Sequence, residues 1–189
     1  VSLSADLYHT FGKVQTNLLV EGFYTILDDV FALRDMDDAA DGGKVKERYN
    51  GSGATVRGFN VEGRAAFTRW FELQAGVTLQ QSRYKEPEFW SEDAEVPPVR
   101  RMFRTPDAYG YFTASFKPVR NFTADLSGTC TGSMLVQHMA GSGVAQDVAV
   151  STPSFFDMNI RLSYDVRIYK EITMQLYGGV QNLFNAYQK

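Results

Sequence analysis

The amino-acid sequence predicts an all-β fold, an antiparallel meander of about eight long strands. Apolar and polar residues alternate with a period of two over long segments, which is typical of strands that have one apolar face. Short and long connections alternate between these segments, and aromatic residues flank the short ones. Helical periodicity is hard to find in any of the 189 residues.

Composition supports this fold class and excludes several functions. The chain holds 14 Phe, 10 Tyr and 16 Gly, a bias toward strands joined by tight turns. Its 19 basic and 22 acidic side chains give a net charge of −3, which argues against binding to nucleic-acid phosphates. The single cysteine, Cys130, excludes a disulfide within the chain. A run of 18 apolar residues, which would predict a transmembrane helix, does not occur.

The first half of the sequence predicts four strands. Residues 3–11 alternate weakly, and residues 14–26 alternate most clearly. One face of that second segment is nearly free of charge, with Val14, Thr16, Leu18, Val20, Gly22, Tyr24 and Ile26. Residues 59–67 and 71–79 repeat the pattern. Each stretch has about the length that crosses the hydrocarbon of a bilayer at a tilt.

The second half of the sequence predicts four more strands of the same kind. They cover residues 108–116, 122–130, 156–164 and 172–180. Each again places apolar side chains on one face and polar side chains on the other. In residues 172–180, for example, Ile172, Met174 and Leu176 alternate with Thr173, Gln175 and Tyr177.

Connections between these strands alternate in length. Short turns are expected near Gly12 and at 68–69, 118–121 and 165–170. Long polar segments are expected at 28–52, 85–105 and 137–152. This layout is typical of an outer-membrane β-barrel, which has tight turns at the periplasmic end and long loops outside.

Aromatic residues mark the level of the short turns, and we interpret them as one girdle at a membrane–water boundary. They are Phe11, Phe67, Trp70, Phe71, Phe116, Phe122, Tyr164 and Tyr169. In a barrel surrounded by lipid, the polar strand face lines the lumen. The charged residues expected there are Glu21, Glu62, Arg64, Glu72, Asp125, Asp157 and Arg161. A soluble sheet would place the same two faces the other way round.

Near its C-terminal end the chain contains the segment GGVQNLFNAY at residues 178–187, interpreted as its last strand. Its core, Asn182, Leu183, Phe184 and Asn185, resembles the NLF[ND] motif of TonB-dependent outer-membrane receptors. Residues 55–63 and Thr105-Pro106-Asp107 also resemble strands of that family. The order and spacing of the strands are similar to the C-terminal third of the family's barrel. The loops and the NLFNAYQ end look most like receptors of Bacteroides-type bacteria.

This resemblance implies a segment of a 22-stranded transmembrane β-barrel. In this family the barrel encloses an N-terminal plug domain, and the receptor couples to TonB. The resemblance implies that residues 1–189 contain neither the plug, nor a TonB box, nor the final strand of the barrel. We therefore expect residues 1–189 to be a single segment of such a barrel. The implied function is active import of a scarce nutrient (an iron chelate, cobalamin or a glycan) across the outer membrane. The implied partners are membrane lipid and lipopolysaccharide, TonB, the plug, and a small-molecule or oligosaccharide substrate.

The segment 85–105 is the expected place of ligand or rim contact, because it combines an aromatic side chain with cations that grip anionic or ring-bearing ligands. The candidate residues are Trp90, Arg100, Arg101 and Arg104. No catalytic residue, metal site or cofactor is expected. The acidic residues Asp37 and Asp41 fit a calcium loop poorly, because Arg48 stands where the bidentate Glu belongs. Two alternatives stay open: a small stand-alone eight-stranded barrel, such as a membrane enzyme or adhesin, and a soluble β-sandwich that binds a ligand.

Overall fold

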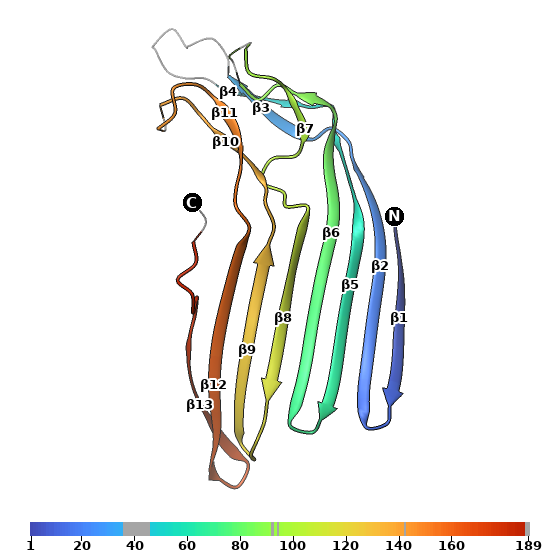
Figure 1. The fold of residues 1–189 in the computed structure, drawn as a ribbon, viewed down its shortest axis with the longest axis vertical. Helices are drawn as coiled ribbons and strands as arrows, with labels where there is room; N and C mark the ends of the chain where they lie inside the picture. Colours follow the sequence, from blue (N-terminus) through green and yellow to red (C-terminus); the bar gives the residue numbers. More distant parts are fainter. Residues whose placement is uncertain (36–45, 92, 94, 142, 188–189) are drawn as a thin grey trace.

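The computed structural model describes residues 1–35, 46–91, 93, 95–141 and 143–187, and they form one tall antiparallel sheet with two small hairpins (Figure 1). Each long strand pairs with the next long strand, so the predicted all-β meander is confirmed. The strands, in the order in which they lie, are β1 (Ser2–Phe11), β2 (Val14–Leu27), β5 (Ala54–Thr68), β6 (Phe71–Glu88), β8 (Ala108–Phe116), β9 (Phe122–Thr131), β12 (Phe155–Tyr169) and β13 (Ile172–Val180).

Short turns gather at one end of the sheet, as predicted (Figure 1). They join β1 to β2, β5 to β6, β8 to β9 and β12 to β13. One prediction was wrong: residues 165–169 are not a turn but the end of β12, and the turn is at Lys170 and Glu171. Asp165 and Val166 stay in register with Gln175 and Met174, so strand pairing continues past the predicted boundary.

The long connections lie at the opposite end and hold more structure than the sequence predicted. Two hairpins form inside them, β3 (Phe31–Asp35) with β4 (Lys46–Asn50), and β10 (Leu135–His138) with β11 (Val148–Ser151). A further strand, β7 (Val99–Arg101), pairs with the end of β6. β6 itself continues to Glu88, so residues 85–88 are strand where a loop was expected.

Strand register sorts the side chains onto two faces, as alternation predicted. One polar row runs across six strands through Asn17, Arg64, Gln74, Thr113, Ser127 and Asn159. The neighbouring apolar row runs through Leu18, Gly63, Ala75, Phe112, Gly128 and Met158. The same pairing places all seven of the charged residues predicted for the polar face on that face.

The apolar face is uncovered. Leu7, Phe59 and Leu79 expose 59%, 65% and 55% of their surface, and Ala54 is the only buried hydrophobic residue among those the structure describes. A soluble sandwich buries such a face against a second sheet. Over the described ranges the only further sheets are the two hairpins at the loop end, so the sandwich interpretation gains no support. An apolar surface of this extent requires a partner or a membrane.

Both edges of the sheet are open, because β1 and β13 each pair on one side only. The chain therefore does not close on itself as a small barrel. The last strand was also predicted too long: it ends at Val180, and residues 181–187 leave the sheet. Asn182 and Asn185 have φ angles of 51° and 49°, a left-handed conformation that ends strand pairing. Among the described residues, no helix is long and apolar enough to span a bilayer.

Candidate functional site

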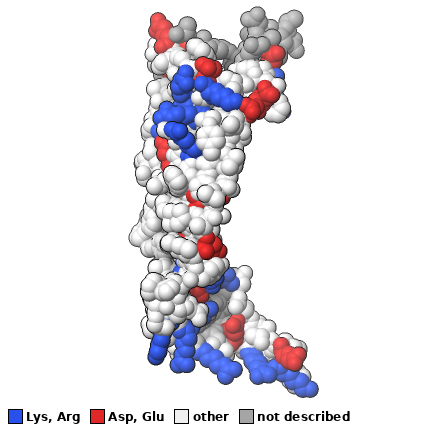
Figure 2. Space-filling model, turned by 90° about the vertical axis from the view of Figure 1, so that its right-hand side faces the viewer, with Lys and Arg blue, Asp and Glu red and all other residues white. Residues whose placement is uncertain are grey.

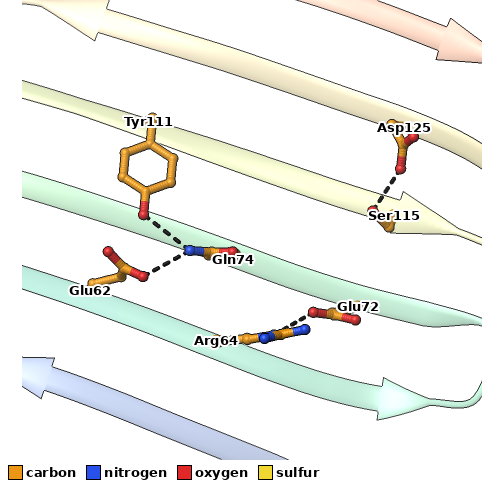
Figure 3. Close-up of polar contacts among 7 residues, drawn as sticks. All are labelled: Glu62, Arg64, Glu72, Gln74, Tyr111, Ser115 and Asp125. Carbon is orange, nitrogen blue, oxygen red and sulfur yellow. Dashed lines mark hydrogen bonds and ion pairs between the residues drawn. The ribbon is translucent and has the colours of Figure 1, made fainter. Parts of the chain in front are cut away.

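The polar face carries a network of side chains centred on Gln74 of β6. Its amide Nε2 donates to Glu62 Oε1 of β5 at 2.7 Å and to the Tyr111 hydroxyl of β8 at 3.1 Å (Figure 3). Gly76 lies opposite Tyr111 in the register, and a Cβ there would come within 2.6 Å of Tyr111 Cε1. Glycine thus leaves room for the tyrosine ring, which lies across β6 and brings its hydroxyl to Gln74.

Further polar contacts extend this network toward both ends of the sheet. Near the turns, Arg64 forms an ion pair with Glu72, and the Ser115 hydroxyl donates to Asp125 at 2.6 Å (Figure 3). Toward the loops, Asn60 donates to Glu21 at 2.9 Å and accepts from the Thr78 hydroxyl at 2.7 Å. The contacts join neighbouring strands, so this face is polar, of mixed charge and linked side chain to side chain.

Such a face suits contact with water or with another polar protein surface, because burying its charged and polar groups in an apolar environment is costly. It has no arrangement typical of a metal centre: among the described residues no three His, Cys, Asp or Glu side chains gather. Asp37 and Asp41, weighed above as calcium ligands, lie outside the described residues. Alternation in the sequence predicted which residues lie on this face. It did not predict the contact between Gln74 and Tyr111, because that contact depends on the strand register.

Trp90, the predicted aromatic contact, lies beside a cavity of about 290 Å³ at the loop end of the sheet. Its ring packs edge to face on Phe103 with 5.5 Å between centroids. Glu88, Gln137 and the ring of Tyr84 also line this cavity. The Trp90 Nε1 atom is buried, with no hydrogen-bond partner in the described structure. A buried indole N–H without an acceptor is uncommon in folded proteins.

The three predicted arginines do not form one cluster around a ligand. Arg100 donates to the Lys85 carbonyl at 3.1 Å and lies 3.9 Å from Glu86. Arg101 donates to the Ser133 carbonyl at 2.8 Å and forms an ion pair with Asp107 at 3.2 Å. Both therefore hold the loops to the sheet.

Arg104 is exposed and adopts a φ of 55°, and its backbone N–H donates to the Leu135 carbonyl. A second tie between loops is the carboxylate of Asp147. It accepts from the Ser91 hydroxyl at 2.6 Å and from the Ala140 N–H at 2.7 Å, and these hydrogen bonds lower the pKa of Asp147.

The motif residues 182–185 form a turn that returns to the sheet. The Asn182 side chain donates to the Ala186 carbonyl at 2.8 Å and accepts from the Ala186 N–H at 2.7 Å. The Leu183 N–H donates to the Met158 carbonyl, and the Phe184 ring packs near Phe156 at 6.1 Å. The asparagine thus closes a hydrogen-bonded turn, and the backbone of Leu183 ties this turn to β12.

Replacing Asn182 with alanine removes both side-chain bonds and leaves alanine in a left-handed conformation that asparagine adopts more readily. We expect a local loss of about 1–2 kcal/mol, seen as roughly tenfold faster amide hydrogen exchange at Ala186. Gln181→Ala, one residue earlier, is the matched control and leaves that rate unchanged. Equal exchange in the two variants contradicts the assigned role of Asn182.

The aromatic residues predicted as a girdle do lie together near the turns. Trp70 packs edge to face on Phe116 at 5.3 Å, and Phe67 stacks on Phe71 at 5.5 Å. At the other limit of the apolar band, Arg57 Nε donates to Gln81 Oε1 at 3.2 Å, where apolar alternation stops. The apolar surface is therefore a band bounded by aromatic rings on one side and by polar side chains on the other.

Comparison with known proteins finds a similar fold in parts of larger proteins of known structure. No protein-family model and no curated protein sequence matches the chain. The ferric-catecholate import receptor Fiu of E. coli K12 is similar at 15% identity, with a TM-score of 0.58 over 97% of this chain and 23% of that chain. The copper transporter OprC is similar at 13% identity, with a TM-score of 0.59 over 97% of this chain and 25% of that chain.

A third similar structure is the siderophore receptor PirA of Acinetobacter baumannii, at 14% identity. Its TM-score is 0.51 over 97% of this chain and 27% of that chain. At such identities the likeness shows the fold, an antiparallel strand meander shared with part of a larger receptor. The chain spans 23% to 27% of the length of these three proteins.

Proposed function

We propose that this chain forms part of the barrel wall and the outer loops of an outer-membrane receptor that imports a scarce nutrient, in the manner of the TonB-dependent family. The observation that carries the proposal is the uncovered apolar band on one face of a sheet whose other face holds a hydrogen-bonded polar network. Lipid covers the first face, and the second faces a lumen with a plug domain.

Several finer features belong to the same proposal. Residues 1–189 are a segment of the C-terminal part of a 22-stranded barrel, in a receptor of Bacteroides type with no catalytic role. Its plug gates passage and TonB supplies the energy. Lipopolysaccharide and phospholipid contact the apolar band. The likeness to import proteins for ferric chelates and copper supports a nutrient as cargo, and an iron chelate, cobalamin and a glycan are the classes to test.

The cavity beside Trp90 is the proposed point of ligand contact, and exposed Arg104, which follows the lining residue Phe103 in the chain, is a further candidate contact. Its aromatic walls suit a ring-bearing ligand, and the unpaired indole N–H suits a ligand oxygen. Arg100 and Arg101 position the surrounding loops through their contacts with Lys85, Glu86, Asp107 and Ser133.

Uptake by whole cells tests this function. Labelled ferric siderophore, cobalamin and oligosaccharide are offered to a Bacteroides-type host with and without the receptor gene. We expect uptake of one class to require both the receptor and TonB. Trp90→Phe keeps an aromatic side chain, although a smaller one, and removes the N–H, and we expect the half-saturating concentration to rise about fivefold to tenfold. Trp70→Phe, at the far end of the sheet, is the control. Unchanged uptake of all three classes without the receptor contradicts the proposal.

A further inference from the structure

The turn end of the sheet is strongly basic. The turns that join the long strands there are residues 12–13, 69–70, 117–121 and 170–171. Their cations are Lys13, Arg69, Lys117, Arg120 and Lys170, and their one acidic residue is Glu171. Figure 2 shows these basic side chains as a row along the lower end of the molecule. The sequence pattern predicted the turns, but the predicted function does not depend on their charge.

Three of these cations line one cleft. It has a volume of about 630 Å³ and lies between the turns at 69–70 and 117–121. Arg69, Lys117 and Arg120 are exposed, and within the described residues their side chains have neither a hydrogen bond nor an ion pair. The acidic residue at the cleft, Asp165, accepts a hydrogen bond from Gln175 at 2.9 Å. With three cations and one acidic residue among its lining residues, the cleft carries a net positive charge.

Backbone hydrogen bonds hold the walls of this cleft together. The Lys117 N–H donates to the Trp70 carbonyl at 2.7 Å, which ties the second turn to the first. The Asp165 N–H donates to the Asn121 carbonyl at 2.8 Å, which ties the second turn to β12. The three cations thus project from turns whose backbones are hydrogen-bonded to neighbouring segments.

The cleft also lies at the boundary of the apolar band. Trp70 and Phe122 line it, and Trp70 packs on Phe116 at the edge of that band. A ligand that fits both surfaces has an anionic group beside the cations and an apolar part beside the rings. We propose that this cleft binds the phosphate headgroup of an anionic phospholipid, whose acyl chains lie along the apolar face, an inference that rests on the proposed membrane function.

A phospholipid suits the cleft better than a free phosphate ion. Exposed cations attract a small anion only weakly in water, because solvent screens the charges. At a membrane surface each Lys or Arg strengthens the attraction of anionic lipid, and the acyl chains add contact with the apolar band. Charge and apolar surface then act together on one molecule.

Nanodiscs test the proposal on the full-length receptor. The discs contain phosphatidylcholine alone or an equimolar mixture with phosphatidylglycerol, and native mass spectrometry measures which lipids stay bound. We expect phosphatidylglycerol to be enriched on the unsubstituted receptor. The variant Arg69→Gln/Lys117→Gln/Arg120→Gln should lose about tenfold of that enrichment, because it removes the three cations that attract the anionic headgroup. The charge-preserving variant Arg69→Lys/Lys117→Arg/Arg120→Lys should retain it.

The control variant Arg48→Gln/Arg83→Gln/Lys85→Gln removes the same charge at the loop end and should keep the enrichment. Equal enrichment in the cleft variant and this control overturns the proposal. So does displacement of phosphatidylglycerol by inorganic phosphate beyond that caused by sodium chloride of equal ionic strength, which would assign the cleft to a free anion. Insertion of the receptor without enrichment contradicts this inference alone, whereas failure to insert in either bilayer contradicts the proposed function as well.

Discussion

Arginine at position 77 or 126 is expected to prevent stable assembly of the receptor in the outer membrane. Val77 lies in register with Val61 and Gly110 on the apolar face and exposes 45% of its surface. Leu126 lies on the same face, paired with Ala114 and Ile160. A cation on the lipid-facing side of a barrel costs about 2–4 kcal/mol near the bilayer midplane. The measurement is the folded, heat-modifiable fraction in outer-membrane preparations.

The matched controls are Thr78→Arg and Ser127→Arg, each one residue further along the same strand and on the polar face. Both positions lie among polar neighbours, so the added cation stays hydrated. We expect these variants to assemble at a level close to that of the unsubstituted receptor. If arginine at 77 and at 78 is tolerated equally, the assignment of the two faces is wrong.

Valine at position 58 is expected to be the most damaging change inside the sheet itself. A Cβ on Gly58 would lie 2.3 Å from the Leu79 carbonyl oxygen and 2.8 Å from Cζ of Phe23. The carbonyl belongs to the backbone of β6, so relief requires the strands to move apart. Overpacking of this kind costs roughly 1–3 kcal/mol, and we expect the midpoint of urea unfolding in lipid vesicles to fall accordingly.

Gly63→Val provides the comparison on the same strand. A Cβ at Gly63 has no atom within 4 Å, so the added side chain fills open space on the apolar face. Its unfolding midpoint should match that of the unsubstituted protein. A loss of stability at position 63 as large as that at position 58 would show that the close approach of β5 and β6 is not the cause.

The long strands were predictable because two signals agreed in each of them. Apolar and polar residues alternate with a period of two, and a turn or a polar connection bounds the alternating stretch. Residues 108–116 match β8 at both ends, and the alternating part of the last strand, residues 172–180, matches β13, although residues 181–187 were also expected to continue that strand. The extension of β6 to Glu88 was not predictable. Beyond Leu79 the strand leaves the apolar band, and Gln80, Gln81 and Ser82 follow one another without alternation. The hairpins in the long connections were missed for a similar reason, since short polar strands give little periodic signal.

The candidate site was predictable as a face but not as a set of contacts. Alternation put Glu62 and Arg64 on the polar side, yet the link from Glu62 through Gln74 to Tyr111 depends on the register across β5, β6 and β8. Arg101 was predicted as a ligand or rim contact, which stays a prediction, and its contacts with Ser133 and Asp107, on other segments, were not foreseen. The composition of a single loop does not show which residues of other segments its arginines contact.

An accessibility scan along β6 tests most directly whether this sheet crosses a membrane with its apolar face in lipid. Spin labels are placed at each position from 71 to 79 in the full-length receptor, in a Cys130→Ser background, and the receptor is placed in a bilayer. We predict that collisions with oxygen, which concentrates in lipid, peak at the odd positions. Collisions with a water-soluble nickel chelate should be absent there. Odd positions that are open to the nickel chelate, or a scan without a period of two, would contradict the account.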